Sequence, residues 1–134
     1  MLGSVEFGDT TVIADLEAGI GTLTRLDAEQ LDVVLVVVEP TPKSIEVGNR
    51  AAGLAREKAL GRVLVVANRV RGDDDLAMIQ GALPVDEVVP VPDDPAVVAA
   101  DRHGDSPLDT APASPAVSAL VRLAERLLPV PAEG

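Results

Sequence analysis

Apolar residues along this chain form short continuous runs that alternate with longer stretches of helical period. The runs are rich in valine and mostly continuous rather than alternating with polar residues, a pattern typical of strands buried on both faces of a parallel sheet. The sequence therefore predicts four strands, at residues 12–15, 33–39, 62–68 and 88–91.

The stretches between the predicted strands carry helical signals. Residues 42–60 are the longest helical candidate, with small residues gathered on one stripe by a 3,4,3,4 spacing: Ile45, Gly48, Ala52, Ala55 and Ala59. Small residues let a helix lie close to a sheet. A shorter helix is predicted over residues 73–83.

Two further helices begin with an N-cap residue followed by proline, which favours the first helical position. One starts at Asp94 and is predicted to stop near Gly104, and the last starts at Ser114 and is ended by Pro129. Strands alternating with helices predict an α/β fold, a three-layer domain with a mainly parallel sheet.

Composition limits the domain count. The chain has 134 residues, of which 47% are hydrophobic, and Phe7 is the only aromatic residue. A chain of this length can bury about two-thirds of its unfolded surface in one core. We expect one domain over residues 1–128 and a short tail over 129–134.

Charge and cysteine content narrow the functional classes. The net charge of -11, with Lys and Arg scattered, argues against a nucleic-acid partner. The absence of cysteine excludes disulfides and thiolate metal sites. The longest apolar run, residues 33–38, is too short to cross a bilayer, and the first ten residues lack signal-peptide character. We expect a cytoplasmic protein with no membrane span.

Ligands of open α/β sheets bind at the carboxyl ends of the parallel strands. The segments that follow the four predicted strands are therefore the candidate site. They are residues 15–19, 39–44, 68–69 and 92–94.

The order of these segments resembles a known family. DLEAG, VVVEPTPKSIEVG, VVANRVR and VPDDPAVVAADRHGDSPLD follow one another as in the carboxyl-terminal part of the MinD/ParA-type P-loop ATPases. In particular they resemble the CooC-type accessory ATPases associated with nickel insertion into carbon monoxide dehydrogenase. The resemblance runs from about residue 2 to residue 128 and implies a P-loop NTPase-like fold that binds ATP and Mg.

The resemblance also implies roles for individual residues. Asp15 matches the acid that holds magnesium, usually through water, and Gly19 matches the glycine whose amide approaches the γ-phosphate. Asn68 matches the residue that recognises the adenine edge, and Arg69 would stack near the base. The loop containing Pro92, Asp93 and Asp94 would pass the purine and ribose.

Departures from the family pattern bear on activity. The glycine-rich phosphate loop with its lysine is absent, because only ten residues precede the run TVIADLEAG, which begins at Thr11 and contains the first predicted strand. Lys43-Ser44 is no replacement, since the neighbouring prolines remove backbone donors. The Gly19-Ile20-Gly21 segment is a weak dinucleotide signal, and the cysteine pair of the nickel-related members is missing. We expect no hydrolysis by this chain alone.

Each candidate also has a structural explanation. Asp15 and Asn68 are common turn formers, and Arg69 is explained equally as a solvated charge. Residues 73–75 are three aspartates at the start of a predicted helix. Helix capping and the helix dipole explain acids at this position, so a bound cation is not needed to account for them. His103 has no catalytic partners in the sequence, and exposure explains Lys43 and Arg25.

Two functional hypotheses follow. The first is an ATP-binding, ATPase-like protein that is inactive without residues outside this sequence, as would result if Met1 were assigned inside a longer reading frame. The second is a non-catalytic interaction module on an ATPase-like scaffold. Without a central phosphate-loop strand, strand edges would be exposed, so we expect a protein partner or a homodimer.

Overall fold

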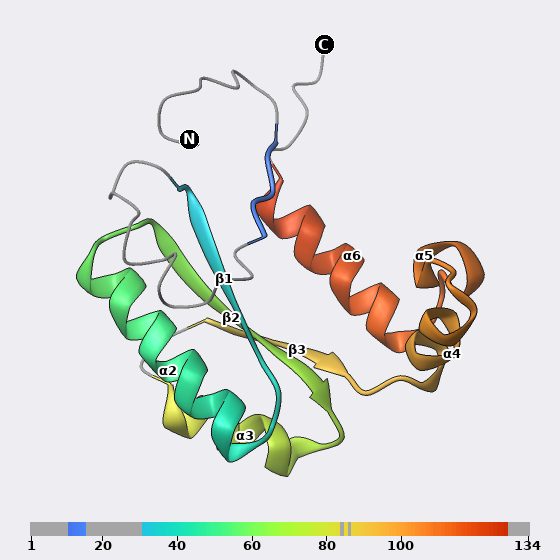
Figure 1. Cartoon of the computed structure of the whole chain (residues 1–134), viewed down its shortest axis with the longest axis horizontal. Helices are drawn as coiled ribbons and strands as arrows, with labels where there is room; N and C mark the ends of the chain where they lie inside the picture. The colour runs from blue at the N-terminus through green and yellow to red at the C-terminus, as the bar shows by residue number, and fades with distance from the viewer. Residues whose placement is uncertain (1–10, 16–30, 84, 86, 129–134) are drawn as a thin grey trace.

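The computed structural model describes residues 11–15, 31–83, 85 and 87–128. Its centre is a sheet of three strands, β1 (Val33–Val38), β2 (Arg62–Val70) and β3 (Val88–Pro92), in the order β1-β2-β3. Both pairs of neighbouring strands are parallel (Figure 1). The predicted α/β fold with a parallel sheet is confirmed, and these strands lie within two residues of their predicted ends.

Helices α2 (Pro42–Glu57) and α3 (Asp73–Ala82) cover one face of the sheet. The close approach of α2 depends on Gly48, because a Cβ at this position would lie 2.1 Å from Cγ1 of Val38. The predicted small-residue stripe is buried at Ile45, Gly48, Ala52 and Ala55. Ala59 is an exception: it is exposed and has a φ of 50°, so α2 ends at Glu57, before the predicted residue 60.

Helix α6 (Pro115–Leu127) covers the opposite face of β2 and β3, which gives the predicted three layers (Figure 1). Its residues Ala116, Ala119 and Leu123 form a second core cluster with residues of the two strands: Leu64, Val66 and Val91. The core thus has one half on each side of the sheet.

Helices α4 (Pro95–His103) and α5 (Pro107–Thr110) connect β3 to α6. The predicted helix signals at Asp94, Gly104 and Ser114 are confirmed: Asp94 and Ser114 cap α4 and α6 with their side chains, and Gly104 ends α4 in the left-handed conformation. Helix α5 was not predicted, because its four residues are too few to show a helical period.

The first predicted strand is not formed. Residues 11–15 adopt no regular secondary structure, and Ile13 is 91% exposed. An apolar run becomes a strand only when it pairs with a neighbour, and the strand pairings of the described residues join only β1 with β2 and β2 with β3.

Candidate functional site

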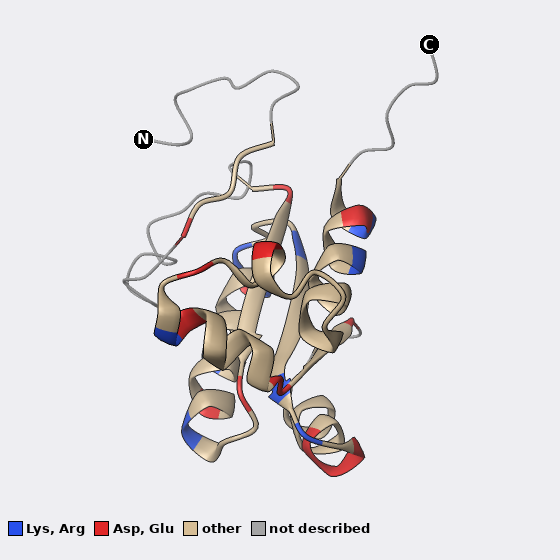
Figure 2. Cartoon of the chain, turned by 90° about the vertical axis from the view of Figure 1, so that its right-hand side faces the viewer, with Lys and Arg blue, Asp and Glu red and all other residues tan. Residues whose placement is uncertain are grey.

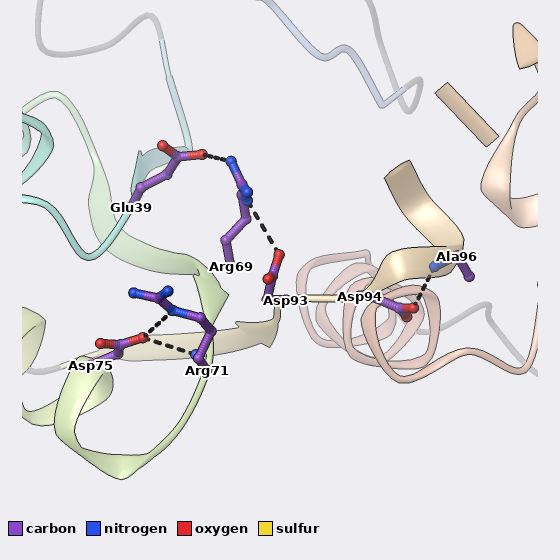
Figure 3. A network of polar contacts seen from close by, with 7 residues as sticks. All are labelled: Glu39, Arg69, Arg71, Asp75, Asp93, Asp94 and Ala96. Atoms are coloured by element: carbon purple, nitrogen blue, oxygen red, sulfur yellow. Dashed lines mark hydrogen bonds and ion pairs between the residues drawn. The ribbon is translucent and has the colours of Figure 1, made fainter. Parts of the chain in front are cut away.

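Charged side chains from all three strands meet at the carboxyl rim of the sheet (Figure 3). Glu39 directly follows β1, Arg69 lies near the end of β2, and Asp93 directly follows β3. The Arg69 guanidinium contacts both acids, with Nη1 3.4 Å from Oε1 of Glu39 and Nε 3.3 Å from Oδ1 of Asp93. Its hydrogen bonds to the two acids raise the pKa of Arg69 above its ordinary value, and the bond to Asp93 has the larger effect.

Arg69 reaches this position because the backbone of β2 is irregular. The pairing of β2 with β3 shifts register between Asn68 and Val70, and Arg69 has a φ of 60°. A residue other than glycine in this left-handed region is uncommon, and such bulges often re-aim a side chain next to a functional site. The backbone N–H of Asp93 donates to the carbonyl of Val70 at 2.9 Å, which fixes the loop after β3 against the bulge.

Four of the six predicted site residues are neighbours at this rim. Asn68 pairs in register with Val91, and Pro92 pairs with Val70, so both lie beside Arg69 and Asp93. Asn68 and Pro92 are half-buried, whereas Arg69 and Asp93 are exposed. The structure therefore brings together the residues to which the base and ribose roles were assigned.

The other two predicted residues are not part of this group. Gly19 lies outside the described residues. Asp15 is exposed and belongs to the segment 11–15, which Figure 1 shows in blue towards the end of the sheet where β1 begins, away from the carboxyl rim. The magnesium role of Asp15 stays a prediction.

Glu39 was not among the predicted site residues, although its segment was. The signal was present in the sequence, since Glu39 follows its strand in the same way as Asp93 follows β3. Its loop is ordered by side-chain hydrogen bonds: the Glu39 N–H donates to Ser44 Oγ at 2.8 Å, and the Ser44 N–H donates to Thr41 Oγ1 at 3.3 Å. Ser44 is thus used to hold the loop, which agrees with its rejection as a phosphate ligand.

Asp94, next to the rim, is 7% exposed. Its Oδ1 accepts from the N–H of Ala96 at 2.9 Å, and its Oδ2 accepts from the N–H of Ala116 at 3.0 Å (the Ala96 bond is drawn in Figure 3). Both hydrogen bonds lower the pKa of the Asp94 carboxyl below its ordinary value, and the bond from Ala116 has the larger effect. Asp94 therefore anchors the loop that carries Asp93 to two helices.

The acids of residues 73–75 lie beside the rim, at the start of α3. Asp75 accepts from the backbone N–H of Arg71 at 3.0 Å and forms an ion pair with its Nε at 3.5 Å. Of the residues that the structure describes, those that line an open hollow of about 510 Å³ are residues 71–75, which follow one another in the sequence. Within the described residues, no three His, Cys, Asp or Glu side chains are grouped to hold a metal ion.

The electrostatics of the rim favour some ligands over others. Among Glu39, Arg69, Asp93 and Asp94, carboxylates outnumber the one guanidinium three to one, and that guanidinium is already paired. In the view of Figure 2, basic residues are scattered over the elements rather than gathered on one face. This arrangement suits the polar edge of a base or sugar hydroxyls, and it opposes unneutralised phosphate.

Comparisons with known proteins agree with the fold. No protein-family model matches the sequence. The chain is 33% identical over 103 residues to the carbon monoxide dehydrogenase accessory protein CooC of Rhodospirillum rubrum, covering 76% of this chain and 39% of CooC. It is 38% identical over 66 residues to an uncharacterized ATP-binding protein of Methanocaldococcus jannaschii, covering 49% of this chain and 26% of that protein.

Solved structures show the same relationship at the level of the fold. The MinD cell division protein of Aquifex aeolicus has a TM-score of 0.61 and 24% identity over 76% of this chain and 47% of that one. A ParA family ATPase from Chlorobium tepidum has a TM-score of 0.52 and 24% identity over 71% of this chain and 41% of that one. The predicted relationship to MinD/ParA-type, CooC-like ATPases is confirmed over part of their length.

The chain spans less than half the length of each of these four proteins. None of the helices in the described part of the chain is long and apolar enough to cross a membrane.

Proposed function

We propose, from the relationship to CooC-like and MinD/ParA-type ATPases, that this chain forms the base-binding side of an ATP site. Asn68 offers a donor and an acceptor to the adenine edge. Arg69 lies beside it as a planar stacking surface, and the loop of Pro92 and Asp93 borders the ribose. The site lies at the carboxyl ends of parallel strands, where α/β sheets bind ligands.

The observation that carries this proposal is the restraint on Arg69. Its guanidinium is held between Glu39 and Asp93, and its backbone is fixed at a φ of 60° by the irregularity in β2. A planar side chain restrained by two carboxylates loses little freedom when a base stacks on it, which favours binding. Asn68 lies directly before this restrained residue.

The phosphates and Mg need further groups. The carboxylate-rich rim fits a base and a ribose but gives no cradle for a triphosphate, and the sequence contains no GxxxxGK[ST] segment. By the resemblance, Asp15 would contact Mg through water, as hard cations prefer oxygen ligands, and Gly19 would approach the γ-phosphate. Hydrolysis then requires residues outside this sequence.

Titration calorimetry tests the proposal on the full chain. Because binding rests on the base and ribose, adenosine and ATP with Mg should bind with similar, weak affinity, and GTP should bind more weakly. Asn68→Ala should weaken adenosine binding by about tenfold, the effect of losing one or two hydrogen bonds. Phosphate release from ATP should stay at background.

Asn49→Ala is the matched control, since Asn49 is an exposed asparagine on α2. It should leave adenosine binding unchanged. Tight ATP binding that survives both Asn68→Ala and Asp15→Ala would show that the site lies elsewhere.

A second candidate function is supported by a separate observation. Leu35 and Val37 of β1 are 42% and 60% exposed, although β1 is an apolar strand without a charged residue. Such exposure favours a protein-interaction module on the same scaffold, and it is compatible with nucleotide binding at the rim.

A further inference from the structure

The turn between β1 and α2, residues 39–44, has no role of its own in the proposed ATP site, although it lies at the same rim. Its prolines remove backbone donors that a phosphate cradle would need. The turn does supply Glu39, one of the two acids that contact the Arg69 guanidinium. What it contributes to the rim is therefore a carboxylate.

The backbone of Glu39 is held from both sides. Its N–H donates to Ser44 Oγ at 2.8 Å, and its carbonyl accepts from the N–H of Thr41 at 2.8 Å. Thr41 is the N-cap of α2, and its Oγ1 accepts from the N–H of Ser44 at 3.3 Å. Before Glu39, the buried Val38 of β1 packs against Gly48 of α2. The carboxylate therefore extends from a point that a strand and a helix both fix.

The second acid is fixed in a similar way on the other side of Arg69. The Asp93 N–H donates to the carbonyl of Val70 at 2.9 Å, and the next residue, Asp94, is buried and bonded to the N-termini of two helices. Because β2 lies between β1 and β3, Glu39 and Asp93 approach Arg69 from opposite sides (Figure 3). Arg69 thus lies between two acids that belong to neighbouring strands.

The two acids contact different ends of the guanidinium. Nε is 3.3 Å from Oδ1 of Asp93, and Nη1 is 3.4 Å from Oε1 of Glu39. A contact at Nε alone would let the planar group pivot about that point and rotate about the Nε–Cζ bond. The second contact, at Nη1, opposes both motions. Guanidinium N–H groups point outward in the plane of the group, so these contacts leave its faces available for stacking.

The consequence of these contacts should be larger for ligand binding than for folding. The Arg69 and Glu39 side chains are 58% and 44% exposed, and exposed ion pairs contribute little to the free energy of unfolding. Ordering a free arginine side chain during binding costs conformational entropy. A side chain that is already held avoids part of this cost.

We propose that Glu39 is a positioning residue of the base site, which acts through Arg69 by holding its guanidinium in the plane on which a purine stacks. Ser44 supports Glu39 by fixing its backbone N–H. The turn of residues 39–44 thus belongs to the base-binding side of the rim. This inference rests on the proposed base site and adds to it a residue that acts without touching the base.

Titration calorimetry with adenosine on the full chain tests whether Glu39 acts through Arg69. Glu39→Ala should weaken adenosine binding by about three- to tenfold, the effect of having to order one long side chain. Glu39→Gln keeps an acceptor oxygen and should weaken binding less. The double variant Glu39→Ala/Arg69→Ala should bind adenosine as Arg69→Ala does, because Glu39 then has nothing to hold.

Glu46→Ala is the matched control, since Glu46 is an exposed glutamate of α2, and it should leave adenosine binding unchanged. Ser44→Ala should weaken binding to the wild type but have no further effect in Glu39→Ala. Salt gives a second readout, because adenosine itself is uncharged at neutral pH. Raising the salt concentration should weaken adenosine binding more in the wild type than in Glu39→Ala, since exposed ion pairs are screened.

A measurement without nucleotide tests the restraint directly. Rotation about the Nε–Cζ bond averages the two Nη signals of an unrestrained arginine in nuclear magnetic resonance spectra. At low temperature, Arg69 of the ligand-free wild type should give two separate Nη signals, and Arg69 of Glu39→Ala should give an averaged one. Arg122, an exposed arginine of α6, should give an averaged signal in both proteins.

Unchanged adenosine binding by Glu39→Ala would overturn the inference, as would an equal loss of binding with and without Arg69. Averaged Nη signals of Arg69 in the wild type would reject the restraint itself. In each of these cases the nucleotide site stands if Asn68→Ala still weakens adenosine binding. Separate Arg69 signals in a chain that binds no adenosine would reject the nucleotide site, and with it the role of Glu39 in base binding.

Discussion

The Asp94 carboxylate accepts a hydrogen bond from the backbone N–H of Ala116 at 3.0 Å, across 22 positions of the sequence. The same carboxylate caps α4 through Ala96, so one side chain serves the N-termini of α4 and α6. Both helix dipoles favour its negative charge. This contact joins the loop at the rim to the helix that covers β2 and β3.

Asp94→Asn should lower Tm by several degrees, because the amide has one acceptor oxygen for two N–H groups and no charge. Thermal unfolding followed by circular dichroism measures the change. Asp105→Asn, at an exposed aspartate after α4, is the control and should have little effect. An unchanged Tm for Asp94→Asn would show that the two bonds contribute little to stability.

The pH dependence of stability should reflect the lowered pKa of Asp94. A group whose pKa is lower in the folded state stabilises the fold above its ordinary pKa, here 3.8. That stability is lost as the pH falls through the folded-state pKa. Urea midpoints of the wild type should therefore fall in acid, and those of Asp94→Asn should fall less. Parallel curves for the two proteins would contradict this.

Gly48→Ala should destabilise the fold by about 1–3 kcal/mol, the usual effect of overpacking a core. The added Cβ would lie 2.1 Å from Cγ1 of the buried Val38, so α2 or the side chain must move. Gly53→Ala on the same helix has open space around the new methyl and should stabilise by about 0.5–1 kcal/mol. Urea unfolding of both variants checks the contrast, and changes of the same sign would contradict it.

Leu64→Ala should cost about 2–5 kcal/mol, because Leu64 is fully buried beneath α6. Leu35→Ala, at its register partner on β1, should cost about 1 kcal/mol or less, since 42% of Leu35 remains exposed. Urea unfolding measures both free energies. Equal costs would mean that the face of β1 is covered in solution, either by this chain or by another.

Arg69→Gly should keep or raise Tm while weakening adenosine binding. Glycine adopts a φ of 60° without strain, and exposed ion pairs contribute little to stability. Arg122→Gly is the comparison: glycine within α6 should destabilise by about 1 kcal/mol and leave adenosine binding unchanged. An equal loss of stability in both variants would show that the Arg69 ion pairs hold the rim together.

Local sequence signals predicted much of the fold. The valine-rich runs that became β1, β2 and β3 are continuous, as is typical of parallel strands that helices cover on both faces, although one face of β1 is exposed at Leu35 and Val37. Asp94 and Ser114 each cap a helix by accepting a hydrogen bond from a residue at most three positions later. The starts of these two helices could therefore be predicted from the local sequence. Helix ends without such a signal, as at Glu57, were predicted less accurately.

The candidate site was predicted in part for the same reason. Asn68, Arg69, Pro92 and Asp93 follow their strands, and parallel strands place these positions at one rim. The role of Glu39 required knowing that Arg69 turns towards it, which depends on the shift of register between β2 and β3. The strand predicted at residues 12–15 failed because pairing needs a neighbour that the local pattern cannot supply.

The sequence by itself determined the three strands that form the sheet and the residues at which the capped helices α4 and α6 begin, because apolar runs and capping act over a few residues. Only the tertiary structure decided that Arg69 lies between Glu39 and Asp93, that Asp94 also holds Ala116, and that Leu35 and Val37 are left uncovered. These features depend on contacts between residues more than 20 positions apart, whose geometry is set by the register of the sheet and by which helix covers which strand.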